Sequence, residues 1–249
     1  RMRPASWAML LVPASHWYDL GIQRTIRITT NTGTSLEGTP EHPIIVADAR
    51  GQFVFRCLRD LQRGDRAIVK YNTQTFGDAT RIPDAETAYI LGLLTGDGCL
   101  TVKGRIAFTN ADREIVDRFC RYFRERYRYT PHRATRPYDF TITDERTYDT
   151  FVNTYGLRAV YAAQKTIPEW ILLAPKPIVR SFLQGLFDTD GTADARRGYV
   201  QLSSSSPALM RTVHVLLLNF GVVNRLHARR KLYNGKLQYY VEMSGDSLP

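Results

Sequence analysis

The sequence predicts an α+β fold, in which a β-rich first third precedes two units that share one αββαββ order. One observation is the alternation of apolar and polar residues, broken by turn residues, up to about residue 82. Another is an apolar helix that ends in Asp-Gly and occurs twice, as ILGLLTGDG at 90–98 and LQGLFDTDG at 183–191. Each copy precedes a hairpin, a helix and further strands, as in an internal repeat. We therefore expect domains at 1–82, 83–163 and 164–249, with the two later units related by pseudo-symmetry.

In the first domain, residues 25–48 alternate as hairpin strands do, and 52–58 and 66–71 indicate further strands. The polar, turn-rich stretch 72–84 is typical of a domain boundary. In the first repeat we expect a helix from Asp84 to Gly98, a hairpin around Gly104, a helix over 110–127, two strands within 131–143 and a helix over 144–156. The second repeat should have a hairpin around Gly198, a helix over 206–221 and strands over 221–230 and 236–244. It lacks a counterpart of the 144–156 helix.

Small residues spaced four apart, Gly92 with Gly96 and Gly185 with Thr189, form one face on each repeated helix. Such a face lets two helix backbones approach closely, and close pairing offsets the cost of mid-helix glycine, about 1 kcal/mol. Paired in this way, the helices would bring Asp97 and Asp190 to the same end. Each carboxylate would then face the negative end of its helix dipole and repel the other, and a divalent cation relieves both penalties. A single apolar helix that ends in Asp-Gly is usually only a core helix; the matched second copy favours a site.

The formal net charge is +10, from 34 basic and 24 acidic residues, and most of the basic residues are arginine. This charge predicts a polyanionic partner, nucleic acid first and an anionic membrane second, although a general arginine bias in the source genome would also contribute. Three widely spaced cysteines indicate free thiols in a reducing compartment, and no zinc-ligand pattern is present.

No stretch is long enough to span a membrane, and the apolar run near the N-terminus is too short for a signal peptide. We therefore expect an intracellular protein, cytoplasmic or nucleoid-associated, that works as a monomer and does not bind membranes.

The two repeated stretches resemble the paired LAGLIDADG motifs of monomeric homing endonucleases, and the resemblance covers about residues 84–249. It implies a saddle of antiparallel sheets on the major groove of double-stranded DNA and metal-dependent hydrolysis of phosphodiester bonds in a long DNA target. The eighth motif residue is the family's metal-binding acid, which corresponds to Asp97 and Asp190. Gly96 and Thr189, which precede these acids, are added to the predicted metal site. The implied metal is Mg²⁺, for which Ca²⁺ or Mn²⁺ can substitute.

The resemblance also gives Lys165, in QKTIPEW, a place beside the metal, where its charge would act on the attacking water or the leaving oxygen. A symmetry mate of Lys165 would fall beyond residue 249. The predicted DNA contacts lie in hairpins and strands, where Arg, Lys and Gln can reach base edges or phosphates. They are Lys103, Arg105, Arg133, Arg136, Tyr138, Arg196, Arg197, Gln201, Arg225, Arg229, Arg230, Lys231 and Lys236. A solvated surface charge is the alternative for each of them.

The stretch TPEHPIIV, residues 39–46, resembles the intein block in which a Thr and a His activate the first peptide bond, here Thr39 and His42. Residues 1–82 are therefore predicted to be a partial Hint-like (intein-like) module, with an unrelated β-rich loop as the alternative. The leading functional prediction is a site-specific DNA endonuclease of the intein-associated type. Two alternatives stay open: a LAGLIDADG DNA-binding protein with weak or no catalysis, and a fragment of a protein-splicing intein.

Overall fold

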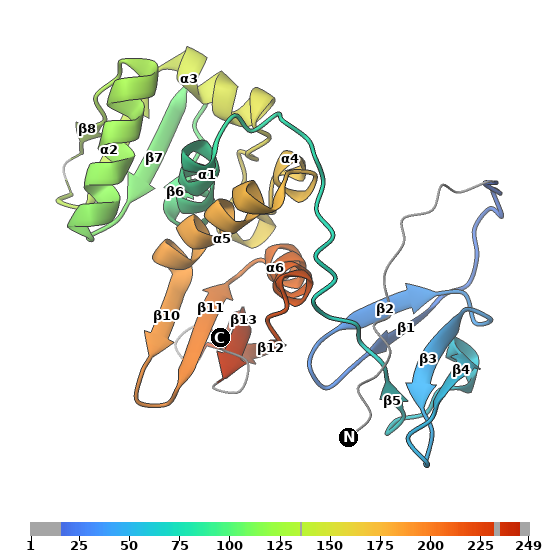
Figure 1. Cartoon of the computed structure of the whole chain (residues 1–249). Helices are drawn as coiled ribbons and strands as arrows, with labels where there is room; N and C mark the ends of the chain where they lie inside the picture. Colours follow the sequence, from blue (N-terminus) through green and yellow to red (C-terminus); the bar gives the residue numbers. More distant parts are fainter. Residues whose placement is uncertain (1–15, 135, 232–234, 245–249) are drawn as a thin grey trace.

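The computed structural model describes residues 16–134, 136–231 and 235–244, and it contains helices and four small antiparallel sheets (Figure 1). In Figure 1 the blue strands of the N-terminal part lie to one side of the green, yellow, orange and red elements. A long irregular segment connects the two parts. No helix in the described part of the chain is long and apolar enough to cross a membrane.

The N-terminal part contains a two-stranded hairpin and a three-stranded sheet of order β4-β3-β5. Its strands are β1 (Ile26–Thr29), β2 (Ser35–Gly38), β3 (Pro43–Ala47), β4 (Phe53–Cys57) and β5 (Arg66–Ala67), with a 3-10 turn at Leu58–Asp60. The predicted hairpin and the strand over 52–58 are confirmed. The strand predicted over 66–71 is wrong beyond Ala67. After Ile68 donates its N–H to Ile45, the chain leaves the sheet and Tyr71 is exposed.

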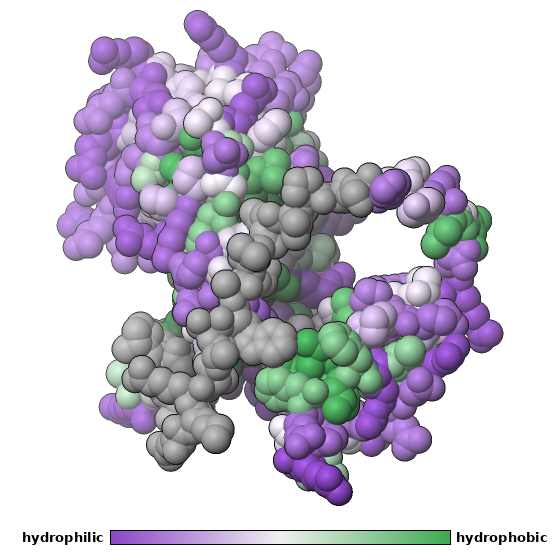
Figure 2. Space-filling model, turned by 45° about the vertical axis from the view of Figure 1, so that its right-hand side comes forward, coloured by the Kyte–Doolittle hydropathy of each residue, from purple (hydrophilic) through white to green (hydrophobic). Residues whose placement is uncertain are grey.

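Hydrophobic burial differs between the two parts of the molecule. The continuous core runs from Ile82 to Met243 and includes the helices of both units. Among the described residues of the N-terminal part, the buried hydrophobic side chains are Val46 and Leu58. Phe53 and Phe55 on β4 are exposed, and Figure 2 shows hydrophobic surface in the lower part of its view. The N-terminal part therefore has a thin core of its own.

Residues 72–84 contain no helix or strand, and their first half lies along the C-terminal end of helix α6 (Pro207–Phe220). The N–H of Asn72 donates to the carbonyl of Leu218 at 2.7 Å. Farther on, the rings of Phe76 and Phe220 meet edge to face at 4.9 Å. The segment 72–84 therefore packs against the second unit through hydrogen bonds and an aromatic contact.

The first unit has the predicted order of helices and strands, and its four strands form a sheet of order β6-β7-β9-β8. Its elements are α1 (Ala85–Asp97), β6 (Gly98–Cys99), β7 (Arg105–Thr109), α2 (Arg113–Tyr127), β8 (His132–Arg133), β9 (Asp139–Thr143) and α3 (Glu145–Asp149). Asp84 caps α1 by accepting the N–H of Thr87, as expected for a helix start. The helix predicted over 144–156 is α3 continued by a widened π-type turn at Thr150–Thr154.

Short helical turns connect the units, and the second unit then repeats the element order with a sheet of order β10-β11-β13-β12. The connecting turns are Ala162–Gln164 and α4 (Glu169–Leu172). The unit consists of α5 (Lys176–Asp190), β10 (Gly191–Asp194), β11 (Tyr199–Ser204), α6, β12 (Arg225–Arg230) and β13 (Leu237–Ser244). Ser206 caps α6 through the N–H of Leu209, and Gly221 ends it at φ +92°. In both sheets the two hairpin strands lie at one edge. The fourth strand of the unit in chain order pairs with the second, and the third strand lies at the opposite edge.

Helices α1 and α5 pack directly against each other through their glycines. A Cβ placed on Gly92 would lie 2.1 Å from the carbonyl oxygen of Phe182, and a Cβ on Gly185 would lie 2.1 Å from that of Tyr89. Both distances are too short for any side chain, so glycine at these positions is required by backbone contact. The predicted close pairing of the two helices is confirmed.

Candidate active site at the paired helix ends

Asp97 and Asp190 are the last residues of α1 and α5, and the chain turns in the same way after each of them. The following glycines have nearly identical extended backbones, with φ −84° and ψ 151° at Gly98 and φ −86° and ψ 155° at Gly191. A strand therefore leaves each helix immediately after the acid. Because the helices pair along their glycine faces, both acids lie at the same end of the pair.

The carboxylate of Asp190 is close enough to Asp97 for the charge of Asp97 to change its pKa. Burial, and then the charge of Asp97, raises the pKa of Asp190 to about 6, while the cation of Lys165 opposes this shift. Burial also raises the pKa of Asp97, against the effects of Asn110 and Lys165. A Cβ on Gly96 would lie 3.4 Å from Oδ2 of Asp190, which shows that Asp190 points towards the end of α1.

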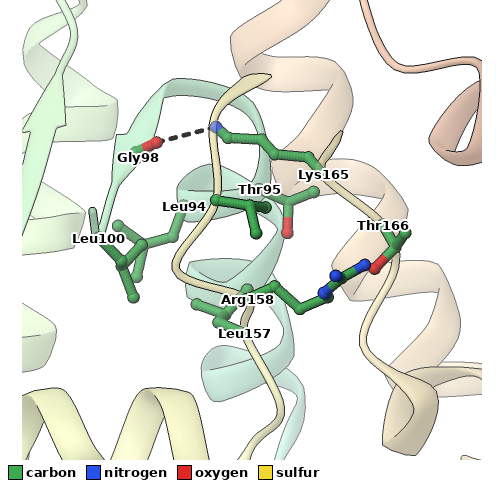
Figure 3. Close-up of a pocket in the computed structure, with 9 residues that line it drawn as sticks. Leu94, Thr95, Gly98, Leu100, Leu157, Arg158, Lys165 and Thr166 are labelled. Carbon is green, nitrogen blue, oxygen red and sulfur yellow. Dashed lines mark hydrogen bonds between the residues drawn. The ribbon is translucent and has the colours of Figure 1, made fainter. Parts of the chain in front are cut away.

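Lys165 lies against the same helix end (Figure 3). Its Nζ donates to the carbonyl oxygens of Gly96 at 2.7 Å and Gly98 at 2.8 Å, on either side of Asp97. Its own carbonyl accepts the hydroxyl of Ser206 at 2.6 Å, which fixes this backbone to the start of α6. Burial lowers the pKa of Lys165, and the charges of Asp190 and Asp97 oppose that shift. The structure thus places a cation beside both acids.

Asn110 is a site residue that sequence reasoning assigned only to the start of a helix. Its Nδ2 donates to Oδ2 of Asp97 at 3.0 Å, while its Oδ1 accepts the N–H of Asp112, the cap of α2. The side chain therefore orients Asp97 and is itself held in place. Asn110 directly follows β7, and Ser204, at the end of β11, accepts the N–H of Ser206 in the same i to i+2 pattern. This shared spacing indicates the turn before each helix, but it does not indicate the contact of Asn110 with Asp97.

Asp188, a second acid near the end of α5, has a different position from Asp190. Its Oδ2 accepts the hydroxyl of Tyr89 at 2.8 Å, which links α5 to α1. Burial and this contact raise the pKa of Tyr89 to about 12, so the phenol keeps its proton. The Arg118 guanidinium lies 3.5 Å from the centre of the Tyr89 ring. Asp188 therefore contributes to helix pairing.

Gly96 and Thr189, which were predicted beside the metal-binding acids, make other contacts. Gly96 gives its carbonyl to Lys165, and the Thr189 hydroxyl donates back to the carbonyl of Leu186 at 2.9 Å. In the described part of the chain there is no group of three or more His, Cys, Asp or Glu side chains that could hold a metal ion. A cation here would therefore be held by Asp97 and Asp190. It would offset their mutual repulsion and the cost of burying two negative charges.

A small cavity opens beside Lys165, next to residues 157–166 between the two units (Figure 3). It is lined by Leu94, Leu157 and Arg158 among others and has a volume of about 10 Å³. That volume holds at most about one water molecule. The cavity is therefore too small for a substrate.

The alternation of side chains along each strand determines which predicted DNA contacts lie on the same face of the sheet. Leu202, Val241 and Met243 are buried beneath the helices, so the residues that alternate with them face away. Gln201, Arg225 and Arg229 lie on this opposite face of the second sheet, according to the strand register. Arg230 lies on the other face and donates to the carbonyl of Gly235.

The other predicted contacts lie at hairpin ends or on the first sheet. Lys103 forms an ion pair with Glu145 at 3.2 Å, and Arg197 pairs with Asp194 at 3.8 Å. Arg105 lies on β7, on the face opposite the buried Ile106. Turn residues or residues next to turns make up the remainder: Arg133, Arg136 and Tyr138 between or beside β8 and β9, Arg196 after β10, and Lys231 and Lys236 between β12 and β13.

Thr39 and His42 lie in one turn before β3. The N–H of His42 donates to the carbonyl of Thr39 at 3.0 Å, and the His42 carbonyl accepts the N–H of Leu58. Cys57, Cys99 and Cys120 are all free thiols, as expected.

Comparison with known proteins gives a family match for the second unit: residues 177–248 match the model of the LAGLIDADG-like domain. The replication factor C small subunit of Thermococcus kodakarensis is 30% identical over 90% of this chain and 25% of its own length. The replicative DNA helicase DnaB of Rhodothermus marinus is 25% identical over 98% of this chain and 27% of its own length. Protein RecA of Mycobacterium tuberculosis is 29% identical over 84% of this chain and 27% of its own length. The chain spans about a quarter of these relatives.

Two solved structures are similar in part. Homing endonuclease I-DmoI, in complex with DNA and Mn, has a TM-score of 0.48 and 19% identity, over 64% of this chain and 89% of that chain. The N-terminal LAGLIDADG domain of WhiA has a TM-score of 0.41 and 14% identity, over 71% and 87%. At these scores and identities, neither match carries information about activity.

Proposed function

We propose that this chain is a site-specific DNA endonuclease of the LAGLIDADG homing type, which hydrolyses phosphodiester bonds with a divalent cation held by Asp97 and Asp190. The observation that carries the proposal is the glycine-mediated pairing of α1 and α5, which brings these acids to one helix-pair end beside Lys165. The LAGLIDADG-like match of residues 177–248 supports it. Mg²⁺ is the proposed metal, and a monomer the proposed state.

The residues of the chain would divide the work in the following way. When bound, the divalent cation would activate water and stabilise the leaving oxygen. Lys165 would add a fixed positive charge where negative charge develops, and Asn110 would keep the Asp97 carboxylate in one orientation. The outward sheet faces and the hairpin ends would hold the duplex through phosphate and base contacts.

The second part of the proposal is that the endonuclease belongs to an intein-type insertion. Three differently named proteins each match most of this chain with only about a quarter of their own length. A segment shared in this way fits an element inserted into longer proteins. The turn that contains Thr39 and His42 would be part of its Hint-like module.

A DNA-binding protein without cleavage is the second candidate. The observation in its favour is that, within the part of the chain that the structure describes, Lys165 is the one cation that lowers the pKa of both acids, whereas a symmetric two-strand cutter would use one near each acid. A splicing fragment that acts with another chain stays a third proposal.

The test uses a pool of randomised DNA duplexes, from which the wild-type protein selects its site in Ca²⁺ and then cleaves it in Mg²⁺. Asp97→Asn and Asp190→Asn should keep binding and lose cutting, because each removes one metal-binding charge. Asp117→Asn, the same change on the exposed side of α2, should keep both. Cleavage that continues in either site variant removes that acid from the mechanism, and selection without any cutting by the wild type favours the binding protein.

A further inference from the structure

The outward face of the second sheet contains a carboxylate in the middle of the predicted DNA-binding surface. Glu242 lies on β13 between Val241 and Met243, which are both buried, so its side chain points to the opposite face. The strand register places Gln201 of β11 directly beside it on one side and Arg225 of β12 on the other. These three side chains form one row across three strands, which we call the central row.

The position of Glu242 in the central row is fixed by a neighbour. Nε2 of Gln201 donates to Oε2 of Glu242 at 3.1 Å. A carboxylate has about four lone-pair sites, so this single bond leaves Glu242 able to accept from another donor. Its charge also acts on the ring of His227, which stacks on Tyr240 at 5.4 Å in the next row.

An acid in this place is unfavourable for binding phosphate. Arg225 and Arg229 share the outward face, and the whole chain carries a net charge of +10, so the surface attracts a polyanion that Glu242 repels. Asp194 is another carboxylate on this face, and it has a structural role: it accepts the turn N–H groups of Arg196 and Arg197, both at 3.0 Å. Glu242 lies in mid-strand, where no turn or helix cap needs an acid.

In the major groove a carboxylate has one favourable partner type, an exocyclic amino group, and glutamate characteristically accepts from cytosine N4. A residue that attracts one base edge and repels phosphate lowers general affinity and increases discrimination. We propose that Glu242, held by Gln201, is a specificity-determining residue that reads a cytosine amino group in the DNA target. This inference rests on the proposed function, since it needs DNA on the outward face.

The experiment is a binding selection in Ca²⁺ from a pool of randomised duplexes, followed by sequencing, with the full chain. Wild type, Glu242→Gln and Glu242→Ala are compared with Glu125→Gln, which removes the same charge from the exposed side of α2. Wild type and Glu125→Gln should both select cytosine at one position. Glu242→Ala should lose that preference by about tenfold or more, and Glu242→Gln should shift it towards adenine, the base that glutamine reads.

A second readout is the affinity for a duplex of unselected sequence, which should increase a few-fold in both Glu242 variants and stay unchanged in Glu125→Gln. Thermal unfolding of each variant shows whether the sheet is intact. The same consensus in all four proteins overturns the role of Glu242. A loss of preference at every position together with a lower melting temperature shows a structural role instead, and also overturns it. Wild-type protein that selects no sequence overturns the proposed function itself.

Discussion

Asp97 and Asp190 occupy the same place in their helices, yet their surroundings differ. Asp97 accepts a hydrogen bond from Asn110, and burial together with the charge of Asp97 raises the pKa of Asp190 to about 6. The pair therefore carries less than its full negative charge below this pH. Lys165, with its Nζ on two backbone carbonyls, compensates part of the remainder.

The raised pKa of Asp190 predicts a pH-dependent stability in chelator. Folded Asp190 binds its proton up to about pH 6, whereas an unfolded aspartate releases it near pH 4, so between these values the folded state binds more protons. Stability should therefore fall as pH rises through this window, by roughly 2–3 kcal/mol. Asp190→Asn should lack this contribution. Urea unfolding of both proteins at pH 4.5 and 7 measures it; parallel pH profiles would contradict the assignment, and Asp117→Asn should follow the wild type.

Asn110 should act on metal use through Asp97. Asn110→Ala removes the hydrogen bonds to Asp97 and to the Asp112 N–H, and partners of metal ligands typically change metal affinity or activity by about 10- to 100-fold. A Mg²⁺ titration of cleavage should therefore shift to higher concentration, while DNA binding in Ca²⁺ changes little. Ser204→Ala, at the end of β11, is the comparison. An unchanged titration for Asn110→Ala would leave Asn110 with a role in capping alone.

At the scale of elements, the sequence patterns predicted those helices and hairpins whose signals are local. Caps at Asp84 and Ser206, and the turn glycines Gly104 and Gly198, act within a few residues of the features they specify. The contact of Asn110 with Asp97, and the hydrogen bonds of Lys165 to the carbonyls of Gly96 and Gly98, depend on how distant segments pack. No spacing rule contains that information. The strand predicted over 66–71 failed for the same reason, because its continuation depends on whether a neighbour covers it.

The glycine contact between α1 and α5 makes a test of the helix pair. Gly185→Ala places a methyl group 2.1 Å from the Tyr89 carbonyl oxygen, so the helices must separate, which typically costs about 1–3 kcal/mol or more. At a few degrees per kcal/mol for a chain of this size, the melting temperature should fall by roughly 3–10 °C. Cleavage should fall with it, because the acids move apart. Gln184→Ala, on the exposed side of α5, should melt like the wild type; an equally stable Gly185→Ala would contradict the close pairing.

At the scale of the whole molecule, the described residues of the N-terminal part contact the second unit through the β1–β2 hairpin and through the segment along α6. The N–H of Leu226 on β12 donates to the carbonyl of Thr32 in the β1–β2 turn. The hydroxyl of Thr34 meets Nε2 of the buried His214 at 2.8 Å, and Nδ1 of that ring meets Oδ1 of Asn224 at 2.6 Å. The hairpin β1–β2 is thus held beside the edge of a predicted DNA-binding sheet.

Asn219 should control how firmly the connecting segment is held. Its side chain accepts the hydroxyl of Thr73 and the N–H of Thr75, at 2.9 Å for the latter, and donates to the Thr75 carbonyl at 2.7 Å. Asn219→Ala removes these bonds, which contribute about 1 kcal/mol each. Because proteolysis follows the population of the open form, a broad-specificity protease should cut within residues 68–84 roughly tenfold faster or more.

The matched control is Asn153→Ala, an exposed asparagine of the π-type turn that bonds only weakly, at 3.4 Å, to Asp149. It should be cut at the wild-type rate. The products of Asn219→Ala should be an N-terminal fragment and a fragment with both units, and the latter should keep the melting temperature of its shared core. Equal cutting rates for Asn219→Ala and wild type would mean that the Phe76–Phe220 contact and the β1–β2 turn hold the N-terminal part without Asn219.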